Sequence, residues 1–351
     1  MTSESSHEAA HALSAKTVQT TRLQTAYREA GDAALPTVVL LHGNVSSSVF
    51  FESTMAALAD RFHLIAPDFR GYGDSERATI DATRGVRDFA DDTVALLDAL
   101  EITGPVDFLG WSAGAGAVMQ IAIDHPERVR RVILEAPMSP FGFGGSAGAD
   151  GQPVTEDFAG SGGGTVNPDF CASLAAGDRS DSPTGARTTM HNFYLLPGTT
   201  LEPAVEERHV DSMLATSIGD DVYPGDSTTS PTWPYVAPGL TGMNNAISAK
   251  YCDLSAYGRL DPMPPTLWIR GDSDQIVADQ SAFDLSYLGQ LGAVPGWPGA
   301  DEAPLQPMVT QVRHVLEIGG DFTEKVYEAC AHSPHVEKPA EFVADFASFL
   351  A

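Results

Sequence analysis

A serine between two glycines is the first residue of this chain whose setting points to chemistry. Ser112 lies at the centre of the pentapeptide GWSAG (residues 110–114). An apolar run at 106–111 predicts a buried strand before it, and the small residues of 113–124 predict a helix after it. A G-x-S-x-G turn between a strand and a helix exposes the serine hydroxyl for nucleophilic attack. The alternative interpretation is a helix start, with Ser112 as its N-cap and the glycines present for packing.

A serine hydroxyl is a weak nucleophile at neutral pH, so it needs a nearby base and a carboxylate that orients the base. Where the nucleophile comes first, the expected order along the chain is serine, then aspartate or glutamate, then histidine. The loop GDSDQIV (271–277) follows a predicted strand and supplies candidate acids. The segment AHSPHVEKP (331–339) follows the last predicted strand and supplies two candidate bases, His332 and His335. The chain therefore offers all three groups in the expected order.

The remaining chain alternates between strand and helix patterns, which predicts a parallel sheet with helices on both faces. Further apolar runs predict strands at 37–42, 63–66, 129–135, 265–270 and 322–329, and alternating residues at 17–29 predict antiparallel edge strands. Helical patterns cover 47–59, 86–100, 113–124, 281–291, 306–317 and 339–350. Functional loops of such a sheet lie at the carboxyl ends of its strands. His42, Asp68, Ser112 and Glu135 all occupy such positions.

The alternation stops between residues 137 and 262, where Gly, Pro, Ser, Thr and Asp dominate. A structureless loop of this length inside a domain is implausible, so 137–262 is interpreted as an inserted cap. The predicted core is then 17–136 together with 263–351, and 1–16 is a predicted disordered tail. Aromatic side chains of the cap either line a pocket or pack the cap onto the core: His191, Phe193, Tyr194, Trp233 and Tyr235.

Composition limits the function classes. The chain has 351 residues, a formal net charge of −27 and only four lysines, which argues against binding to nucleic acid. No stretch approaches the roughly 18 apolar residues of a membrane span, and the polar residues 1–16 do not have the pattern expected of a secretory signal. The three cysteines are odd in number and far apart, which argues against a disulfide framework. We expect a cytoplasmic protein without membrane association, and the sequence leaves a homodimer open.

These motifs together resemble the capped, single-domain α/β-hydrolases, a family that includes esterases, lactonases and carbon–carbon bond hydrolases. The matching landmarks occur in the family's order: HGN (42–44), DFRGYGDS (68–75), GWSAG (110–114), HPERV (125–129), GDSDQIV (271–277) and HSPHVEKP (332–339). The resemblance covers about 20–136 and 263–351 and implies the α/β-hydrolase fold, a mostly parallel doubly wound sheet with an inserted cap. The arginine and aspartates of 68–75 are interpreted as holding a turn.

The resemblance also assigns roles to residues. Ser112 matches the nucleophile, Asp274 the acid and His332 the base, while the backbone N–H groups of Ala113 and Asn44 match the oxyanion hole. The family commonly has glycine before the histidine, whereas this chain has alanine. Two alternatives stay open: His335 is a second candidate base, and Glu135 occupies the place where some relatives carry the acid.

These roles imply a serine hydrolase that cleaves a carboxylic ester or lactone, with no metal or organic cofactor. Haloalkane dehalogenases and epoxide hydrolases use aspartate as the nucleophile, so Ser112 excludes both chemistries. The expected partner is a small apolar or cyclic substrate. The alternatives are carbon–carbon bond hydrolysis, aminopeptidase action with Glu206 and Glu207 holding the amine, and a non-catalytic ligand-binding protein of the same fold.

Overall fold

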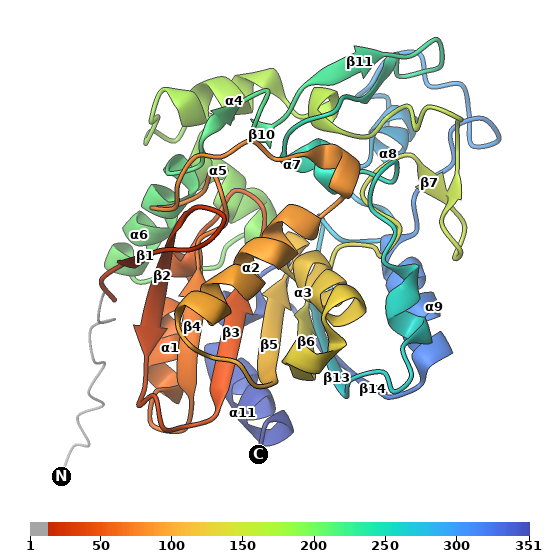
Figure 1. Ribbon diagram of the computed structural model, residues 1–351. Helices are drawn as coiled ribbons and strands as arrows, with labels where there is room; N and C mark the ends of the chain where they lie inside the picture. Colours follow the sequence, from red (N-terminus) through yellow and green to blue (C-terminus); the bar gives the residue numbers. More distant parts are fainter. Residues whose placement is uncertain (1–12) are drawn as a thin grey trace.

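A twisted sheet of eight strands runs through the computed structural model, which describes residues 13–351 (Figure 1). Its strand order is β1-β2-β4-β3-β5-β6-β13-β14. The strands are β1 (Lys16–Gln19), β2 (Gln24–Ala30), β3 (Thr37–Leu41), β4 (His63–Pro67), β5 (Val106–Trp111), β6 (Val129–Glu135), β13 (Thr266–Gly271) and β14 (Phe322–Tyr327). The β1–β2 and β2–β4 pairs are antiparallel, and all other pairs of this sheet are parallel. The predicted fold class is confirmed.

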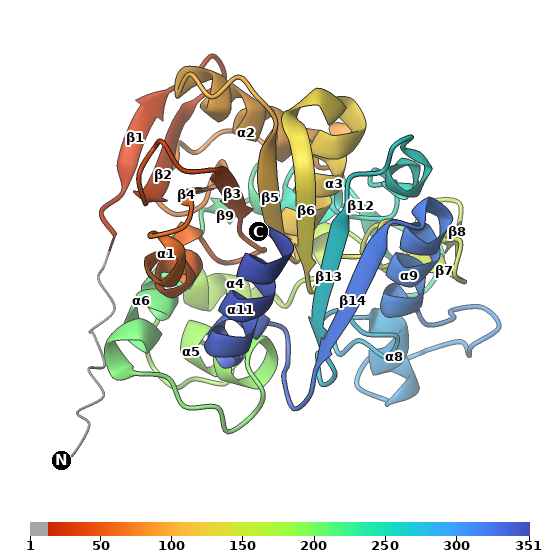
Figure 2. The same ribbon diagram turned by 90° about the horizontal axis from the view of Figure 1, so that it is seen from below.

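Helices cover both faces of the sheet (Figure 2). On one face lie α1 (Glu52–Leu58), which continues the 3₁₀ helix Ser48–Phe51, and α11 (Pro339–Phe349). On the other lie α2 (Arg87–Ala99), α3 (Ala113–Asp124) and α9 (Met308–Gly319). Because both faces are covered, the central strands are mostly apolar, and every residue of β5 is buried.

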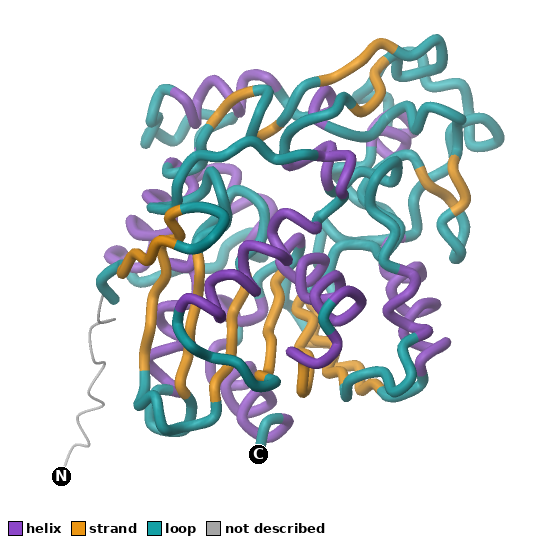
Figure 3. Tube along the Cα trace, in the orientation of Figure 1, coloured by secondary structure: helices purple, strands orange, loops and turns teal. Residues whose placement is uncertain are grey.

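The segment 137–262, predicted as a cap, passes over the carboxyl ends of the central strands (Figure 1). Much of it is loop, interrupted by short helices and two-stranded pairs (Figure 3). Its helices are α4 (Pro168–Ala175), α5 (Ala186–Thr189), which runs into the π-helix Met190–Tyr194, α6 (Pro203–Leu214) and α7 (Met243–Ala246). Its strands are β7 (Ser146–Ala147), β8 (Gln152–Pro153), β9 (Ile218–Gly219), β10 (Tyr223–Pro224), β11 (Ser227–Thr229) and β12 (Val236–Pro238). We call 137–262 the cap segment, and its limits stay a prediction.

Three sequence predictions need correction. The predicted tail at 1–16 is too long at its end, because Lys16 pairs with Tyr27 in β1, while residues 1–12 lie outside the described part of the chain. The predicted helix 281–291 is only α8 (Leu285–Gln290), because the Ser281 hydroxyl donates to a backbone carbonyl and holds a turn before it. The last strand ends at Tyr327, and Ala329 has a positive φ of 47° that extended backbone does not allow.

In the part of the chain that the structure describes, no helix combines the length and the apolar character required to cross a membrane.

Candidate active site

The turn between β5 and α3 holds Ser112 in a strained backbone conformation. Its φ and ψ angles are 57° and −117°, a region that non-glycine residues rarely occupy. The tight turn requires both flanking glycines. A Cβ on Gly110 would lie 2.5 Å from the Ala115 Cα, and one on Gly114 would overlap the backbone carbonyl oxygens at the end of β3. The strain and the close packing together aim the Ser112 side chain away from the sheet.

His332 and Asp274 form a buried hydrogen-bonded pair at the same edge of the sheet. The His332 Nδ1 lies 2.8 Å from the Asp274 Oδ2. The other carboxylate oxygen of Asp274 accepts the backbone N–H groups of Ile276 at 2.7 Å and Val277 at 3.0 Å. Since the carboxylate is an acceptor, Nδ1 carries the proton, and the Nε2 lone pair of His332 is left to act as a base. Ser112 and His332 line one cavity.

The alternative acid and base pair with each other instead. The His335 Nδ1 lies 2.7 Å from Glu135 Oε1, and the His335 backbone N–H donates to the same oxygen at 2.8 Å. Neither of these residues is among those that line the cavity containing Ser112. The structure therefore contains two separate histidine–carboxylate pairs, whereas the sequence left open which histidine pairs with which carboxylate.

Two backbone N–H groups beside Ser112 are free to bind a developing oxyanion. Among residues 13–351, the N–H groups of Asn44 and Ala113 donate to no protein acceptor. Both residues line the cavity. The loop after β3 lies directly against Ser112, because a Cβ on Gly43 would be 3.1 Å from the Ser112 Cβ. Two unpaired donors beside a nucleophile are the geometry that stabilises a tetrahedral intermediate.

His42 fixes the shape of this loop. Its Nε2 accepts the backbone N–H of Phe69 at 3.0 Å, and its Nδ1–H donates to the Gly43 carbonyl at 2.7 Å. Burial lowers the pKa of His42 to about 4, so the imidazole is neutral at physiological pH and can hold both bonds. The histidine of the HGN motif thus has a structural role.

Three polar side chains that the sequence did not assign to the site hold Asn44. The Tyr72 hydroxyl donates to Asn44 Oδ1 at 2.7 Å, and the Asn44 amide donates to Asn244 Oδ1 at 3.2 Å. The Tyr194 hydroxyl donates to the Asn44 carbonyl at 2.8 Å. Because Tyr194 and Asn244 belong to the cap segment, this segment helps to position the loop that carries Asn44. No local pattern could have identified Asn244, which lies 200 residues from Asn44.

The cavity has a volume of about 430 Å³ and lies between the core and the cap segment. From the core it is lined by Asn44, Val45, Ser112, Ala113, Ile276, Val277, Ala282, Phe283, Leu285, Leu288 and His332. From the cap segment it is lined by Met138, Phe143, Thr165, Val166, Asn167, Phe170, Pro183, Thr184, Thr189, Phe193, Tyr194, Tyr223, Asn244 and Ile247. None of these residues is Lys, Arg, Asp or Glu. The lining is mostly apolar, with a few amide and hydroxyl groups.

Glu337 links the histidine loop to the cap segment. One carboxylate oxygen accepts the backbone N–H of Ala331 at 2.8 Å, and the other accepts the backbone N–H of Leu196 at 2.7 Å. Burial raises the pKa of Glu337 above its usual value, while these N–H groups oppose the shift. The glutamate of the HSPHVEKP motif therefore braces the residue before His332.

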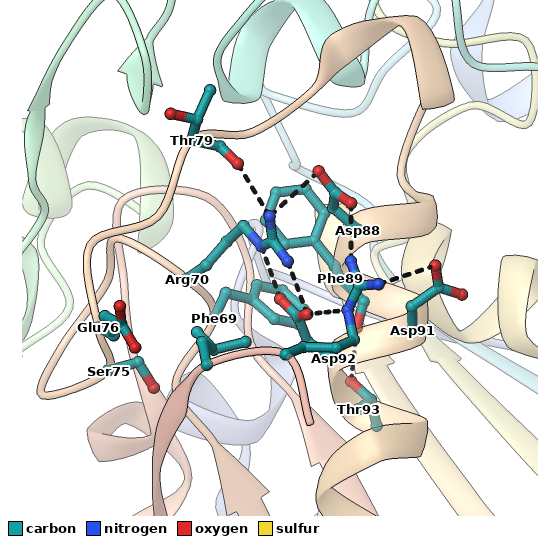
Figure 4. A network of polar contacts seen from close by, with 12 residues as sticks. Phe69, Arg70, Ser75, Glu76, Thr79, Asp88, Phe89, Asp91, Asp92 and Thr93 are labelled. Atoms are coloured by element: carbon teal, nitrogen blue, oxygen red, sulfur yellow. Dashed lines mark hydrogen bonds and ion pairs between the residues drawn. The ribbon is translucent and has the colours of Figure 1, made fainter. Parts of the chain in front are cut away.

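The segment 68–75 holds a turn through buried ion pairs, as predicted (Figure 4). The Arg70 guanidinium makes two hydrogen bonds to Asp92, at 2.6 and 2.7 Å, and a third to the Thr79 carbonyl at 2.8 Å. Asp88 lies 3.2 Å from the same guanidinium. These contacts tie the loop after β4 to α2, and none of the four residues lines the cavity.

The two glutamates predicted as a possible amine site, Glu206 and Glu207, pair with arginines outside the cavity. Glu207 pairs with Arg187 at 2.5 Å and with Arg179 at 2.7 Å, and Glu206 pairs with Arg187. Neither glutamate lines the cavity. The interpretation of Glu206 and Glu207 as an amine site is therefore wrong.

Comparison with known proteins gives matches to hydrolases. A family model described as "alpha/beta hydrolase fold" matches residues 36–286. The 2-hydroxymuconate semialdehyde hydrolase of Pseudomonas sp. (strain CF600) is 38% identical over 122 residues, which are 34% of this chain and 39% of that protein. This chain thus spans well under half of that relative's length.

Solved structures match over nearly the whole chain. The esterase RhEst1 from Rhodococcus sp. ECU1013 matches with a TM-score of 0.59 and 20% identity, covering 96% of this chain and 98% of the esterase. The carboxylesterase CesB (YbfK) from Bacillus subtilis matches with a TM-score of 0.58 and 16% identity, covering 97% of this chain and 92% of that enzyme. At these identities the similarity describes the fold.

Proposed function

Because the chain belongs to the α/β-hydrolase fold family, we propose that it is a serine hydrolase that cleaves a carboxylic ester or lactone through an acyl-enzyme. One observation carries the proposal. A serine in a strained turn and a histidine hydrogen-bonded to a buried carboxylate line one cavity, which two unpaired backbone N–H groups also face. This set provides a nucleophile, a base, an orienting group and an oxyanion site.

The residues of the site divide the steps of the proposed reaction among them. His332 Nε2 takes the proton of Ser112 as its oxygen attacks the acyl carbon, and Asp274 stabilises the imidazolium that forms. The N–H groups of Asn44 and Ala113 bind the oxyanion. The imidazolium then protonates the leaving alcohol, and His332 activates the water that releases the acid.

The lining supports a neutral, apolar substrate of moderate size. A carboxylate or ammonium group in the cavity would lose its hydration without gaining an ion partner, because no Lys, Arg, Asp or Glu among residues 13–351 lines the walls. A volume of about 430 Å³ is in the range of small-molecule sites. An aryl ester or a lactone with an apolar acyl part fits this description.

Carbon–carbon bond hydrolysis is the second candidate, and the 38% identity to a 2-hydroxymuconate semialdehyde hydrolase favours it. The same triad can serve that reaction. A muconate-type substrate carries a carboxylate, for which the lining offers no cation. A neutral β-diketone has no carboxylate and therefore needs no cation in the lining. A ligand-binding protein without activity is the candidate from another class.

A fluorophosphonate probe tests the nucleophile. We expect the wild-type protein to be labelled at one site and Ser112→Ala not to be labelled. His332→Ala should slow labelling and ester hydrolysis by about 10⁴-fold, because the serine then lacks its base. Thr165→Ala, at the cavity wall, is the control and should be labelled as fast as the wild type. A wild-type protein that is folded and not labelled would contradict the serine hydrolase and leave the ligand-binding alternative.

A matched pair of substrates tests the character of the cavity. We expect a p-nitrophenyl ester of hexanoate to have a kcat/KM at least about 100-fold above that of the ester with a carboxylate at the end of the same chain, since the buried charge has no partner. Phe193→Arg places a cation at the cavity wall and should reduce the ratio of the two kcat/KM values. Equal rates with both esters in the wild type would contradict a neutral substrate. A vinylogous diketone assayed in parallel reports on carbon–carbon cleavage.

A further inference from the structure

A second histidine–carboxylate pair lies behind the candidate active site. Glu135 is the last residue of β6, and His335 lies in the short helix α10 (Pro334–Glu337). The side chains of both residues are at most 1% exposed. Glu135 Oε1 accepts two hydrogen bonds from His335, one from Nδ1 at 2.7 Å and one from the backbone N–H at 2.8 Å. The pair plays no part in the proposed reaction, because neither residue lines the cavity.

The burial of this pair calls for a reason beyond stability. Removing two ionisable groups from water costs free energy, and an apolar pair of similar volume is often as stable or more stable. In addition, Glu135 Oε2 and His335 Nε2 have no hydrogen-bond partner among the described residues. Buried polar atoms without a hydrogen-bond partner lower the stability of a protein, so their presence in a core indicates a functional constraint.

Glu135 joins the two loops whose relative position sets the reaction. Its backbone carbonyl accepts the N–H of Ser112 at 2.9 Å, and its carboxylate accepts the N–H of His335, three residues after His332. One residue of β6 is thus bonded both to the nucleophile turn and to the segment that carries the base.

Trp111 makes the same connection from the other side. Its indole N–H donates to the His332 carbonyl at 2.8 Å, and its ring packs edge-on against the His335 imidazole with a centroid distance of 5.0 Å. The imidazole therefore also supports the ring that holds the His332 backbone.

We infer that Glu135 and His335 are positioning residues that set the distance between the Ser112 hydroxyl and the His332 imidazole. The inference rests on the proposed function. Displacement of reacting groups by about 1 Å can cost about 100-fold in rate. The pair therefore affects the chemical step, while the cavity that binds the substrate lies elsewhere.

The test compares Glu135→Leu, Glu135→Gln and His335→Gln with the wild type. The first readout is the rate at which diisopropyl fluorophosphate labels the protein, because this reagent is too small to depend on contacts with the cavity walls. The second is kcat and KM for a neutral ester. Both are expressed per folded molecule. We expect Glu135→Leu to lower kcat and the labelling rate together by about 10- to 100-fold, with KM changed less than about twofold. Glu135→Gln keeps an oxygen that accepts both hydrogen bonds from His335, and should restore most of the rate. His335→Gln keeps only the hydrogen bond from the backbone N–H of residue 335 to Glu135. Its kcat and labelling rate should therefore lie between those of the two Glu135 variants.

Asp107→Asn is the matched control. Asp107 is a fully buried carboxylate near the start of β5, the end away from Ser112, where it pairs with Arg130 and Arg131. Its loss should lower the melting temperature and leave the labelling rate of the folded protein unchanged. A merely structural role of Glu135 would give the same result as this control.

Three outcomes would overturn the inference. The first is folded Glu135→Leu that is labelled at the wild-type rate. The second is a loss as large as that of His332→Ala, which would make Glu135 the triad acid. If Glu135→Leu does not fold, wild-type rates in both Glu135→Gln and His335→Gln would overturn it. Labelling of Ser112→Ala would instead contradict the proposed function itself, so the two failures can be told apart.

Discussion

The histidines around Ser112 differ in what their ring nitrogens contact, and this decides what each can do. His332 has a carboxylate on one nitrogen and the cavity beside it, which suits a base. His42 has a backbone partner on each nitrogen, which suits a brace. His209 stacks on Phe50 with a centroid distance of 4.1 Å, and its Nδ1 has no partner among the described residues.

His209 should make the protein sensitive to acid. Burial, aided by the positive charge of Arg208 and the nearby His335, lowers its pKa from 6.5 to about 3 in the folded protein. As the pH falls below 6.5, the unfolded chain binds a proton at this site and the folded chain does not, so stability decreases until the pH reaches the folded value. We expect His209→Phe to reduce the loss of unfolding free energy between pH 7.5 and pH 5 by about 2 kcal/mol.

Urea unfolding of both proteins at the two pH values measures this difference. Phe50→Leu is the control, because it removes the stacking partner and leaves the titrating group in place. It should lower stability equally at both pH values. An unchanged pH dependence in His209→Phe would show that other groups cause the acid sensitivity.

At the scale of elements, the nucleophile turn depends on how closely α3 approaches β3. An added Cβ at Gly114 would lie 2.5 Å from the His42 carbonyl oxygen and closer still to that of Leu41. Backbone atoms cannot yield as a flexible side chain can. We expect Gly114→Ala to lower the free energy of unfolding by about 3 kcal/mol and to abolish labelling of Ser112.

Gly104→Ala is the matched control for this substitution. No atom lies within 4 Å of the position of an added Cβ at Gly104. Its effect on the free energy of unfolding should stay within about 0.5 kcal/mol. Chemical denaturation of the two variants gives the comparison, and a mild effect of Gly114→Ala would contradict the tight turn.

At the scale of the whole molecule, ion pairs fasten the cap segment to the core. The Arg208 Nε of α6 lies 2.6 Å from the Glu52 Oε2 of α1, and Glu52 is nearly buried. Arg77 and Asp221 make a second such pair at 2.5 Å, with side chains 50% and 42% exposed. Water screens the second pair far more than the first.

Removing Arg208 should therefore matter more than removing Arg77. We expect Arg208→Met to lower the free energy of unfolding by about 2 kcal/mol, because the buried Glu52 carboxylate then keeps only Arg28 of its two arginine partners among the described residues. Arg77→Met should change it by less than about 0.5 kcal/mol. Thermal unfolding of both variants measures the effects, and similar values would mean that burial of Glu52 is unimportant here.

The sequence by itself determined the layered fold and the place of the candidate nucleophile. Both rest on local signals: apolar runs define strands covered on two faces, and glycines around Ser112 define the turn. The order of motifs along the chain then supplied the candidate loops, and the resemblance to the α/β-hydrolases predicted Asp274 and His332, with Glu135 and His335 as alternatives. The sequence pattern predicts helix over residues 281–284, whereas the buried Ser281 hydroxyl donates to the Ile276 carbonyl and holds a turn before α8, a contact that no sequence pattern reveals.

Tertiary structure alone decided which acid meets which histidine. His332 and His335 are three residues apart, and only the order of β5, β6 and β13 in the sheet brings one to Asp274 and the other to Glu135. The residues that line the cavity could not be predicted from the sequence either. Asn244 reaches Asn44 across 200 residues, and such contacts depend on how the cap segment packs on the core, for which no periodicity in the sequence exists.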